Sequence, residues 1–317
     1  MLARLIPDKF ILLLLATIGL ATLIPAHGQG LAIVSVISNI AIFSLFFFHG
    51  LRLAHEAVWA GLRHWRLQLS VLAFVFGVMP LAGLATSALL PGLLSPPVWL
   101  GILFLCALPS TVQSAIAYSS VAGGNVAASV IAAALSNLAG VVLTPLVFAA
   151  LAHVGGVAID LSTISRIAAL LLLPFVLGQI ARHWLAAWAE RNRGWIGRLD
   201  KLTIIITVYV AFSAAVTDGL WGRLDGAEML RLLGFVAALL AFAMASAWGL
   251  GAALGLPRAD RITLLFSGAH KSLATGAPMA RILFPAAQAG MIVIPLMIYH
   301  QLQLTVSAWI AARLARN

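Results

Sequence analysis

The sequence has few charged residues, and this scarcity excludes a soluble fold. Only 9% of its 317 residues are charged and 62% are hydrophobic, with a mean hydropathy of +1.07. A soluble domain has about 25% charged residues. The apolar runs are also too long and too continuous for the alternating strands of an outer-membrane barrel. The sequence therefore predicts an all-α integral membrane protein.

Residues that would support catalysis or a disulfide framework are also scarce. Cys106 is the single cysteine, so no disulfide can form within the chain. The sequence has no His-Glu-x-x-His element for a metalloprotease and no pair of mid-span Asp for an aspartyl protease. A Ser110 or Ser114 nucleophile with His270 would lack an orienting carboxylate and a Gly-x-Ser-x-Gly element. We expect neither an enzyme nor a cofactor.

Hydropathy, with Gly, Pro and charges as boundaries, divides the chain into ten candidate transmembrane helices. One crossing takes about 20 mostly apolar residues, so ten crossings use about 200. The ranges are 8–25, 31–52, 67–89, 97–120, 125–152, 161–186, 199–219, 228–254, 260–284 and 287–314. The first could instead be a cleaved signal peptide, because Arg4 precedes an apolar stretch. Asp8, Lys9 and the poor cleavage sequence 26–28 favour a retained span.

The basic residues are distributed unevenly between the two ends of these spans. Fourteen lie on one side: Arg4, Lys9, Arg52, Arg63, Arg66, Arg182, Arg191, Arg193, Arg198, Lys201, Arg258, Arg261, Arg313 and Arg316. Four lie on the other: Arg166, Arg223, Arg231 and Arg281. The positive-inside rule then places both termini in the cytoplasm, with the chain in the inner (plasma) membrane. Topology accounts for most of the net charge of +10, so no nucleic-acid partner is needed.

Two spans carry polar residues and helix breakers at mid-length. Residues 108–115 read Leu-Pro-Ser-Thr-Val-Gln-Ser-Ala, and residues 267–278 read Ser-Gly-Ala-His-Lys-Ser-Leu-Ala-Thr-Gly-Ala-Pro. A break that faces lipid is too costly, so protein or a water-filled cavity must surround it. Ordinary Pro and Gly kinks are the alternative, but the clustered hydroxyl, amide and charged groups favour discontinuous helices.

The two breaks occupy matching places in the two halves of the chain. Ser110 and Lys271 are 161 residues apart, and each lies in the fourth helix of a five-helix half. Five helices per half is an odd number, so the second half must be inverted relative to the first. Broken helices at matching positions of inverted halves indicate a transport site near the membrane midplane.

Six short motifs resemble the bile acid:sodium symporter family, in particular its SBF-like branch. The resemblance covers nearly the whole chain, and the motifs are specific together rather than singly. They are Phe-Phe-Phe-His-Gly-Leu at 46–51, Leu-Pro-Ser-Thr-Val-Gln-Ser at 108–114, Ala-Gly-Gly-Asn at 122–125, His-Lys-Ser-Leu at 270–273, Gly-Ala-Pro at 276–278 and Ile-Tyr-His-Gln-Leu-Gln-Leu at 298–304.

This resemblance implies an architecture and a mechanism. It implies ten helices in two inverted five-helix repeats, 1–155 and 156–317, in which helices four and nine are unwound where they cross. It also implies a panel (about 1–60 and 158–222) and a core (about 66–155 and 226–314). In the family, substrate and sodium bind at or behind the crossing, and alternating access moves core against panel.

Several positions depart from the pattern of sodium-coupled members of the family. Those members have Ser-Asn where this chain has Ser114-Ala115, and Ser with a Thr one turn later where it has Ser129 and Ala133. A Gln five residues before the Pro of helix three becomes Val75, and a Glu of helix nine falls at or beside His270 and Lys271. Sodium needs several oxygen ligands and some negative charge, so sodium binding is not expected.

Lys271 is the most informative residue. An ammonium at the bilayer centre costs several kcal/mol unless it is solvated or paired, and all nine Asp and Glu map to span ends or loops. Hydroxyl and carbonyl groups of the broken helices could hold it, it could be neutral and carry a proton, or it could meet an anion. Held as an ammonium, it would take the place of a sodium ion at the crossing. The remaining alternative is a misassigned span from which it snorkels to the interface.

The candidate substrate or ion site consists of polar residues on the broken helices and their neighbours. Asn125 is expected to cap the fifth helix, and His270, His300, Asn137 and Gln303 could equally be hydrogen-bonded packing residues. The full set is Ser110, Thr111, Gln113, Ser114, Asn125, Ser129, Asn137, His270, Lys271, Ser272, Thr275, His300 and Gln303.

These patterns predict a secondary transporter of a small organic anion. The negative charge of the substrate should lie near the half-helix N-termini and Lys271. Transport should be independent of sodium, either proton-coupled through Lys271 or His270 or by uniport. The alternative is a membrane regulator or receptor on a transporter fold, which binds a ligand or influences ion handling without net flux. Lipid and the organic anion are the expected partners, and no oligomer is required.

Overall fold

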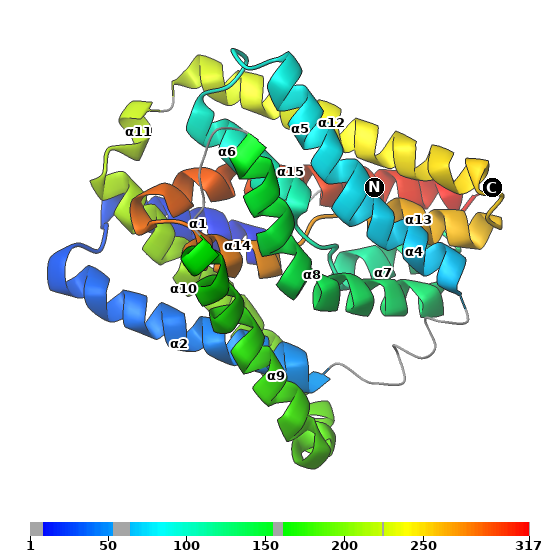
Figure 1. Ribbon diagram of the computed structural model, residues 1–317, viewed down its shortest axis with the longest axis horizontal. Coiled ribbons are helices and arrows are strands. Elements are labelled where there is room, and N and C mark those ends of the chain that lie inside the picture. The colour runs from blue at the N-terminus through cyan, green and yellow to red at the C-terminus, as the bar shows by residue number, and fades with distance from the viewer. Residues whose placement is uncertain (1–8, 53–63, 155–160, 224, 317) are drawn as a thin grey trace. The chain divides into compact units, whose positions relative to one another are not determined.

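The computed structural model describes residues 9–52, 64–154, 161–223 and 225–316 (Figure 1). Every regular element in these ranges is helical, as the composition predicts. Five charged residues lie outside the described residues: Arg4, Asp8, Glu56, Arg63 and Asp160.

Six described helices are long and apolar enough to cross a membrane, which establishes a multi-pass membrane protein. They are Gly28–Arg52, Trp65–Leu89, Val126–Ala152, Arg193–Thr217, Gly226–Ala253 and Ala287–Leu314. Two shorter apolar helices span Leu12–Leu23 and Pro96–Ala107.

The chain forms two compact units. Unit 1 consists of Met1–Leu53, Asp160–Gly226 and Gly276–Ile294, and unit 2 consists of Ala54–Ile159, Ala227–Thr275 and Pro295–Asn317. Each unit is thus assembled from segments that are far apart in the sequence.

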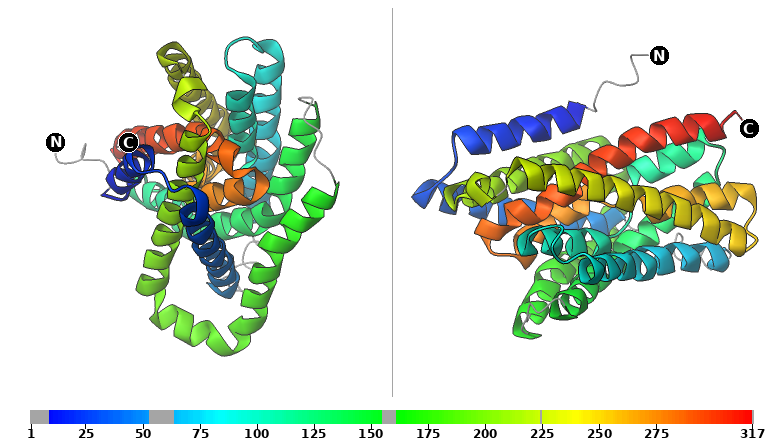
Figure 2. Two further views of the ribbon diagram at one scale, coloured as in Figure 1. Left: turned by 90° about the vertical axis from the view of Figure 1, so that its left-hand side faces the viewer. Right: turned by 90° about the horizontal axis from the view of Figure 1, so that it is seen from above.

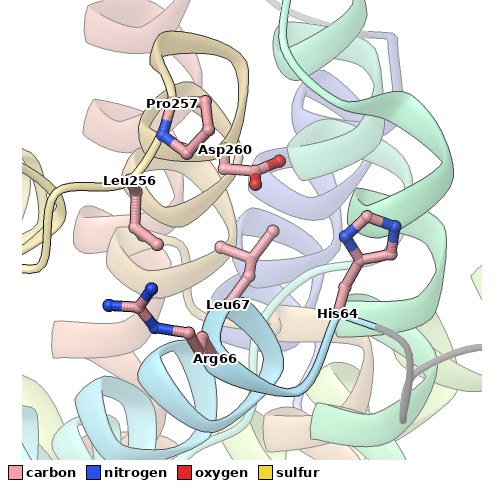
Figure 3. Close-up of a pocket in the computed structure, with 6 residues that line it drawn as sticks. All are labelled: His64, Arg66, Leu67, Leu256, Pro257 and Asp260. Carbon is pink, nitrogen blue, oxygen red and sulfur yellow. The ribbon is translucent and has the colours of Figure 1, made fainter.

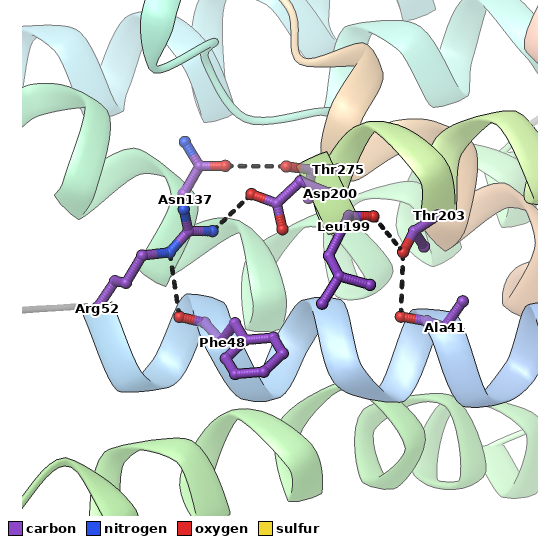
Figure 4. A network of polar contacts seen from close by, with 8 residues as sticks. All are labelled: Ala41, Phe48, Arg52, Asn137, Leu199, Asp200, Thr203 and Thr275. Carbon is purple, nitrogen blue, oxygen red and sulfur yellow. Dashed lines mark hydrogen bonds and ion pairs between the residues drawn. The ribbon is translucent and has the colours of Figure 1, made fainter. Parts of the chain in front are cut away.

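In unit 1, α2 packs against α9 and α10, and α1 packs against α10. An ion pair joins α2 to α10, with 2.6 Å between Arg52 Nη2 and Asp200 Oδ2 (Figure 4). The helices are α1 (Lys9–Leu23), α2 (Gly28–Arg52), α9 (Leu161–Arg191), α10 (Arg193–Thr217) and the short α11 (Leu220–Arg223).

The helices α9 and α10 extend beyond the ranges predicted from hydropathy. The predicted spans ended at 186 and began again at 199, whereas α9 continues to Arg191 and α10 begins at Arg193. Figure 2 shows the two helices meeting in a V at this elbow. Hydropathy detects only the apolar part of a helix, and the intervening Ala, Glu and Arg residues are good helix formers. The predicted boundaries here were therefore wrong.

Two glycines allow the backbones of α2 and α9 to approach closely. A Cβ added to Gly178 would overlap the carbonyl oxygen of Phe47, and one added to Gly50 would overlap that of Phe175. Small residues at a helix interface permit this close approach within a membrane.

We expect a Gly178→Ala substitution to lower the melting temperature by several degrees, because overpacking a tight contact costs about 1–3 kcal/mol. Gly197→Ala is the matched control, because no atom lies within 4 Å of a Cβ added at Gly197 in α10. Fluorescence-detected size-exclusion chromatography after heating compares the two variants. Equal melting temperatures would contradict the packing described for α2 and α9.

Unit 2 contains the interrupted spans. The helix α13 contacts α4, α7 and α8, while α8 also contacts α4, α6 and α7. The helices are α4 (Trp65–Ala73), α5 (Met79–Leu89), α6 (Pro96–Ala107), α7 (Gln113–Val121), α8 (Val126–Val154), α12 (Gly226–Ala253) and α13 (Arg258–Ala269). Two further helices, α14 (Leu273–Leu283) and α15 (Ala286–Leu314), contribute residues to both units.

A π-helical turn, η2 (Phe74–Val78), joins α4 to α5. The N–H of Met79 bonds to the carbonyl of Phe74, five residues earlier, rather than to that of Val75. The next residue, Pro80, has no N–H to donate. The carbonyl of Val75 therefore receives no bond from its own helix, and this frees it for another partner.

Candidate functional site

Two spans are interrupted at the predicted places, and the interruptions contact each other. The helix α6 ends at Ala107 and α7 begins at Gln113, while α13 ends at Ala269 and α14 begins at Leu273. The N–H of Ser272 in the second break donates to the carbonyl of Pro109 in the first, at 3.0 Å. The predicted discontinuities are confirmed.

Side chains of α8 form hydrogen bonds with the backbone groups that the first break leaves without a helical partner. Thr144 Oγ1 donates to the carbonyl of Ala107 at 2.9 Å, and Ser136 Oγ accepts from the N–H of Ser110 at 2.9 Å. Asn137 Nδ2 donates to the carbonyl of Ser110 at 2.9 Å. A buried backbone group without a partner would cost about 1–3 kcal/mol, so these three side chains stabilise the broken conformation.

Side chains of α15 do the same for the second break. The amide of Gln303 pairs with both backbone groups of Lys271: its Oε1 accepts from the N–H at 2.8 Å and its Nε2 donates to the carbonyl at 3.0 Å. The hydroxyl of Tyr299 donates to the carbonyl of Ala269 at 2.7 Å. The unwound residue thus gains from Gln303 the pair of hydrogen bonds that a helix would otherwise provide.

Asn137 connects the two breaks. While its Nδ2 holds Ser110, its Oδ1 accepts a 2.9 Å hydrogen bond from Thr275 Oγ1 (Figure 4). Ser272 Oγ in turn donates to Thr275 Oγ1 at 3.0 Å and accepts from the N–H of Thr275 at 3.2 Å. The first turn of α14 is therefore capped by Ser272 and attached to α8 through a continuous polar chain.

His270 lies buried among hydroxyl groups from α7, α15 and the first break. Its Nε2 is 2.7 Å from Ser307 Oγ, and its Nδ1 is 3.2 Å from Ser114 Oγ and 3.3 Å from Thr111 Oγ1. The ring of Tyr118 meets it edge-on, with 5.8 Å between centroids. Both ring nitrogens have partners, so His270 ties α15 and the start of α7 to the second break.

Lys271 is fully buried, and backbone carbonyls hold its ammonium group. Its Nζ lies 3.1 Å from the oxygen of Val75, 2.9 Å from that of Cys106 and 2.8 Å from that of Leu108. An ammonium has three N–H donors, and these three contacts use them all. Burial excludes the snorkelling alternative, and the full set of carbonyl partners leaves no donor for a substrate anion in this conformation.

Comparisons with known proteins identify the family. A sequence profile of the SBF-like CPA transporter family matches residues 8–316. The chain belongs to this family. It is 46% identical to an uncharacterized protein of Pseudomonas aeruginosa strain PAO1, over 99% of this chain and 95% of that protein.

Two further relatives come from a bacterium and from a vertebrate. The chain is 42% identical to YfeH of Escherichia coli strain K12, over 98% of this chain and 93% of that protein. It is 27% identical to Sodium/bile acid cotransporter 7 of Mus musculus, over 96% of this chain and 94% of that protein. The SBF-like assignment therefore identifies a transporter rather than an enzyme.

Two predicted site residues of this SBF-like protein form a separate polar cluster rather than part of the crossing. Asn125 Oδ1 accepts from the N–H of Ala128 at 3.0 Å, which confirms the predicted cap of α8. Asn125 Nδ2 donates to Asp260 Oδ1 at 2.9 Å. Ser129 Oγ donates to Thr263 Oγ1 at 3.3 Å. These contacts join the starts of α8 and α13.

Two other predicted residues lie at the edge of the crossing. Gln113 is exposed at the first residue of α7, outside the buried polar region of the two breaks. His300 is half-buried, and its Nδ1 accepts a 2.9 Å hydrogen bond from Gln303 Nε2. His300 therefore supports Gln303, which in turn holds the backbone of Lys271.

Sequence reasoning missed several groups that build the crossing. Four residues supply side-chain hydrogen bonds and were not among the predicted site residues: Ser136, Thr144, Tyr299 and Ser307. The carbonyls of Val75 and Cys106 were also missed, because every residue has a carbonyl. The prolines at 80 and 109 were the available signal, since each removes an N–H donor from the carbonyls before it.

A small hollow elsewhere in unit 2 does not include the crossing. It has a volume of about 170 Å³ (Figure 3). It is lined by His64, Arg66, Leu67, Leu256, Pro257 and Asp260. Asp260 is already bonded to Asn125. None of the lining residues is among the predicted site residues.

Proposed function

We propose that this SBF-like protein is a secondary transporter that moves a small organic anion by alternating access, without sodium. In this proposal the chain has ten transmembrane helices in two inverted repeats, 1–155 and 156–317. A core of about 66–155 and 226–314 moves against a panel of about 1–60 and 158–222. The protein lies in the inner (plasma) membrane with both termini in the cytoplasm.

The carbonyl-bound ammonium of Lys271 is the observation that carries the sodium-independent mechanism. Among the described residues at the two breaks, the one charged side chain is a cation, and its hydrogen-bond partners are neutral carbonyls. A sodium ion about 4 Å from this ammonium would be repelled by about 4 kcal/mol at an effective dielectric of 20. That repulsion lowers affinity by nearly a factor of 1,000.

The side chains at the other expected sodium positions support the same proposal. Ala115 and Ala133 are fully buried and have no side-chain oxygen. Val75 offers only its main-chain carbonyl, which Lys271 already occupies. A sodium ion would therefore find too few oxygen ligands and no carboxylate.

The start of α7 is the position that we propose for the negative charge of the substrate. The first N–H groups of a helix have no partner within it and carry the positive end of the helix dipole. Val112 is 45% exposed, Gln113 is exposed, and no side chain caps this end of α7. The name of the mouse relative refers to both sodium and bile acid, and its reference to bile acid supports an organic anion as the class of substrate.

We expect uptake into proteoliposomes to be the same in sodium as in choline at fixed pH and ionic strength. The labelled probes are taurocholate, an amphipathic anion, and benzoate, a small aromatic carboxylate. Melting temperatures in the two salts should also agree, because no sodium binds. A saturable sodium dependence in the millimolar range, abolished by Ser114→Ala or Ser129→Ala, would overturn the proposal.

The same proteoliposomes distinguish proton-coupled transport from uniport. If transport is proton-coupled through His270 or Lys271, an imposed pH gradient drives probe accumulation above equilibrium. A uniporter only equilibrates the probe. Saturable binding of either probe without flux would indicate the regulator on a transporter fold instead.

A further inference from the structure

The three carbonyls around Lys271 have the character of a cation-binding site. They belong to Val75 in η2 and to Cys106 and Leu108 at the end of α6, and they converge on one buried nitrogen. Backbone carbonyls arranged in this way can replace the hydration shell of a monovalent cation. In this chain the cation is covalently attached to the protein.

Two prolines leave the carbonyls of Val75 and Cys106 free to bind a cation. Pro80 has no N–H for the carbonyl of Val75, and the N–H of Met79 bonds to Phe74 instead. At the end of α6 the last turn is 3₁₀, since the N–H of Leu108 bonds to the carbonyl of Leu105 at 3.3 Å. The next donor in that pattern, which would serve the carbonyl of Cys106, is Pro109, and it has no N–H. These two carbonyls therefore have no hydrogen-bond donor from their own helices.

Further contacts keep the end of α6 open. The N–H of Ser110, which would bond to Cys106 in a continuous helix, bonds to Ser136 Oγ. Leu108 has an extended conformation, with φ −73° and ψ 150°, so its carbonyl points out of the helix. The negative end of the α6 dipole adds to the attraction for a cation at this point.

The backbone that carries the ammonium is held independently of the ammonium itself. Gln303 holds both backbone groups of Lys271, and Ser272 is bonded to the carbonyl of Pro109. Removal of the lysine side chain would therefore leave the neighbouring backbone attached to α15 and α6. It would also leave three oxygen acceptors around an empty space.

We propose that the carbonyls of Val75, Cys106 and Leu108 form a binding site for a primary ammonium ion, which the side chain of Lys271 fills from within. The distances of 2.8–3.1 Å are hydrogen-bond distances and suit an –NH₃⁺ group. The inference deepens the proposed function, because it assigns the place of a bound sodium ion to a residue of the chain. It does not depend on the substrate, so stability alone can test it.

The test is chemical rescue of a Lys271→Ala variant. Alanine keeps Cβ, so the part removed corresponds to n-propylammonium. We expect the variant to melt about 5 °C or more below the parent, and n-propylammonium chloride to restore most of this loss with a saturable concentration dependence. Isopropylammonium has the same charge and composition but a branched shape, and tetramethylammonium has no N–H donor. Neither should restore stability.

Two control variants exclude a general effect of amines. Thr144→Val removes the hydrogen bond to the neighbouring carbonyl of Ala107, at the same helix end, but no charge. Lys271→Met fills the space of the lysine stem. We expect n-propylammonium to raise the melting temperature of neither variant, nor that of the parent. Equal rescue by n-propylammonium and isopropylammonium, or no rescue by either, would overturn the proposal.

If Lys271→Ala aggregates on extraction, the yield of monodisperse protein becomes the measurement. A higher yield in n-propylammonium than in isopropylammonium supports the site, and equal yields overturn it. A sodium dependence of uptake in proteoliposomes would overturn the proposed transport mechanism and would leave the result of the rescue experiment unaffected. Failure of the rescue would overturn the ammonium site without affecting the assigned family.

Discussion

Replacing Lys271 with methionine is expected to leave the chain inserted in the membrane and to reduce uptake more than tenfold. The substitution leaves three buried carbonyls without their donor, at a cost of about 1–3 kcal/mol each. About 1.4 kcal/mol already changes a conformational equilibrium tenfold, so the conformation described here should be populated much less, although Ser272 and Gln303 still hold the backbone of the two breaks. Insertion should not suffer, because a charge at the bilayer centre is itself unfavourable.

Uptake of labelled taurocholate and benzoate measures the functional effect, and size-exclusion chromatography of the extracted protein measures folding. Lys201→Met is the matched control, since Lys201 is an exposed lysine on α10. It should leave both readings unchanged. A Lys271→Met protein that folds and transports like the parent would show that the buried charge is incidental.

Replacing Gln303 with leucine is expected to destabilise the second break by about 5 °C or more in melting temperature. Leucine has a similar volume but neither donor nor acceptor, so the N–H and carbonyl of Lys271 would both lose their partners. Each buried backbone group without a partner costs about 1–3 kcal/mol. Gln303 is fully buried, so water cannot easily replace it.

Gln301→Leu is the control, because it makes the same change two residues away on the same helix. The side-chain oxygen of Gln301 is buried and has no hydrogen-bond partner among the described residues. Removing it should leave stability unchanged or slightly higher. The melting temperatures of both variants test the prediction. A similar decrease in the two would show that the pairing of Gln303 with the backbone of Lys271 contributes little to stability.

Hydropathy and helix breakers predicted most of the described helices and both discontinuities. Apolar runs of about 20 residues identify spans without knowledge of their neighbours. Pro109 and the polar residues around Lys271 mark the breaks, because a continuous helix cannot use a proline N–H. The elbow between α9 and α10 was predicted less well, since the helices continue to Arg191 and from Arg193 outside the apolar runs.

The candidate site was predicted in composition but only partly in arrangement. The structure brings Ser110, Asn137, Lys271, Thr275 and Gln303 into one hydrogen-bonded region. Asn125 and Ser129 instead join the starts of α8 and α13, and Gln113 is exposed. These differences depend on the rotation of each helix about its axis, which is set by its packing partners. Periodicity within α7 or α8 does not specify that rotation.

The sequence by itself determined that this protein is helical, spans a membrane and carries one lysine at a break in an apolar span. These properties follow from local chemistry, because a bilayer accepts few structures and few charges. The tertiary structure alone decided how that lysine is stabilised. Hydroxyls, water, an anion or carbonyls could each have received its ammonium, and the choice required Val75 and Cys106 to converge from separate helices. The fold leaves these carbonyls without a donor from their own helix and directs them at a cation, and the identity of their residues does not indicate this.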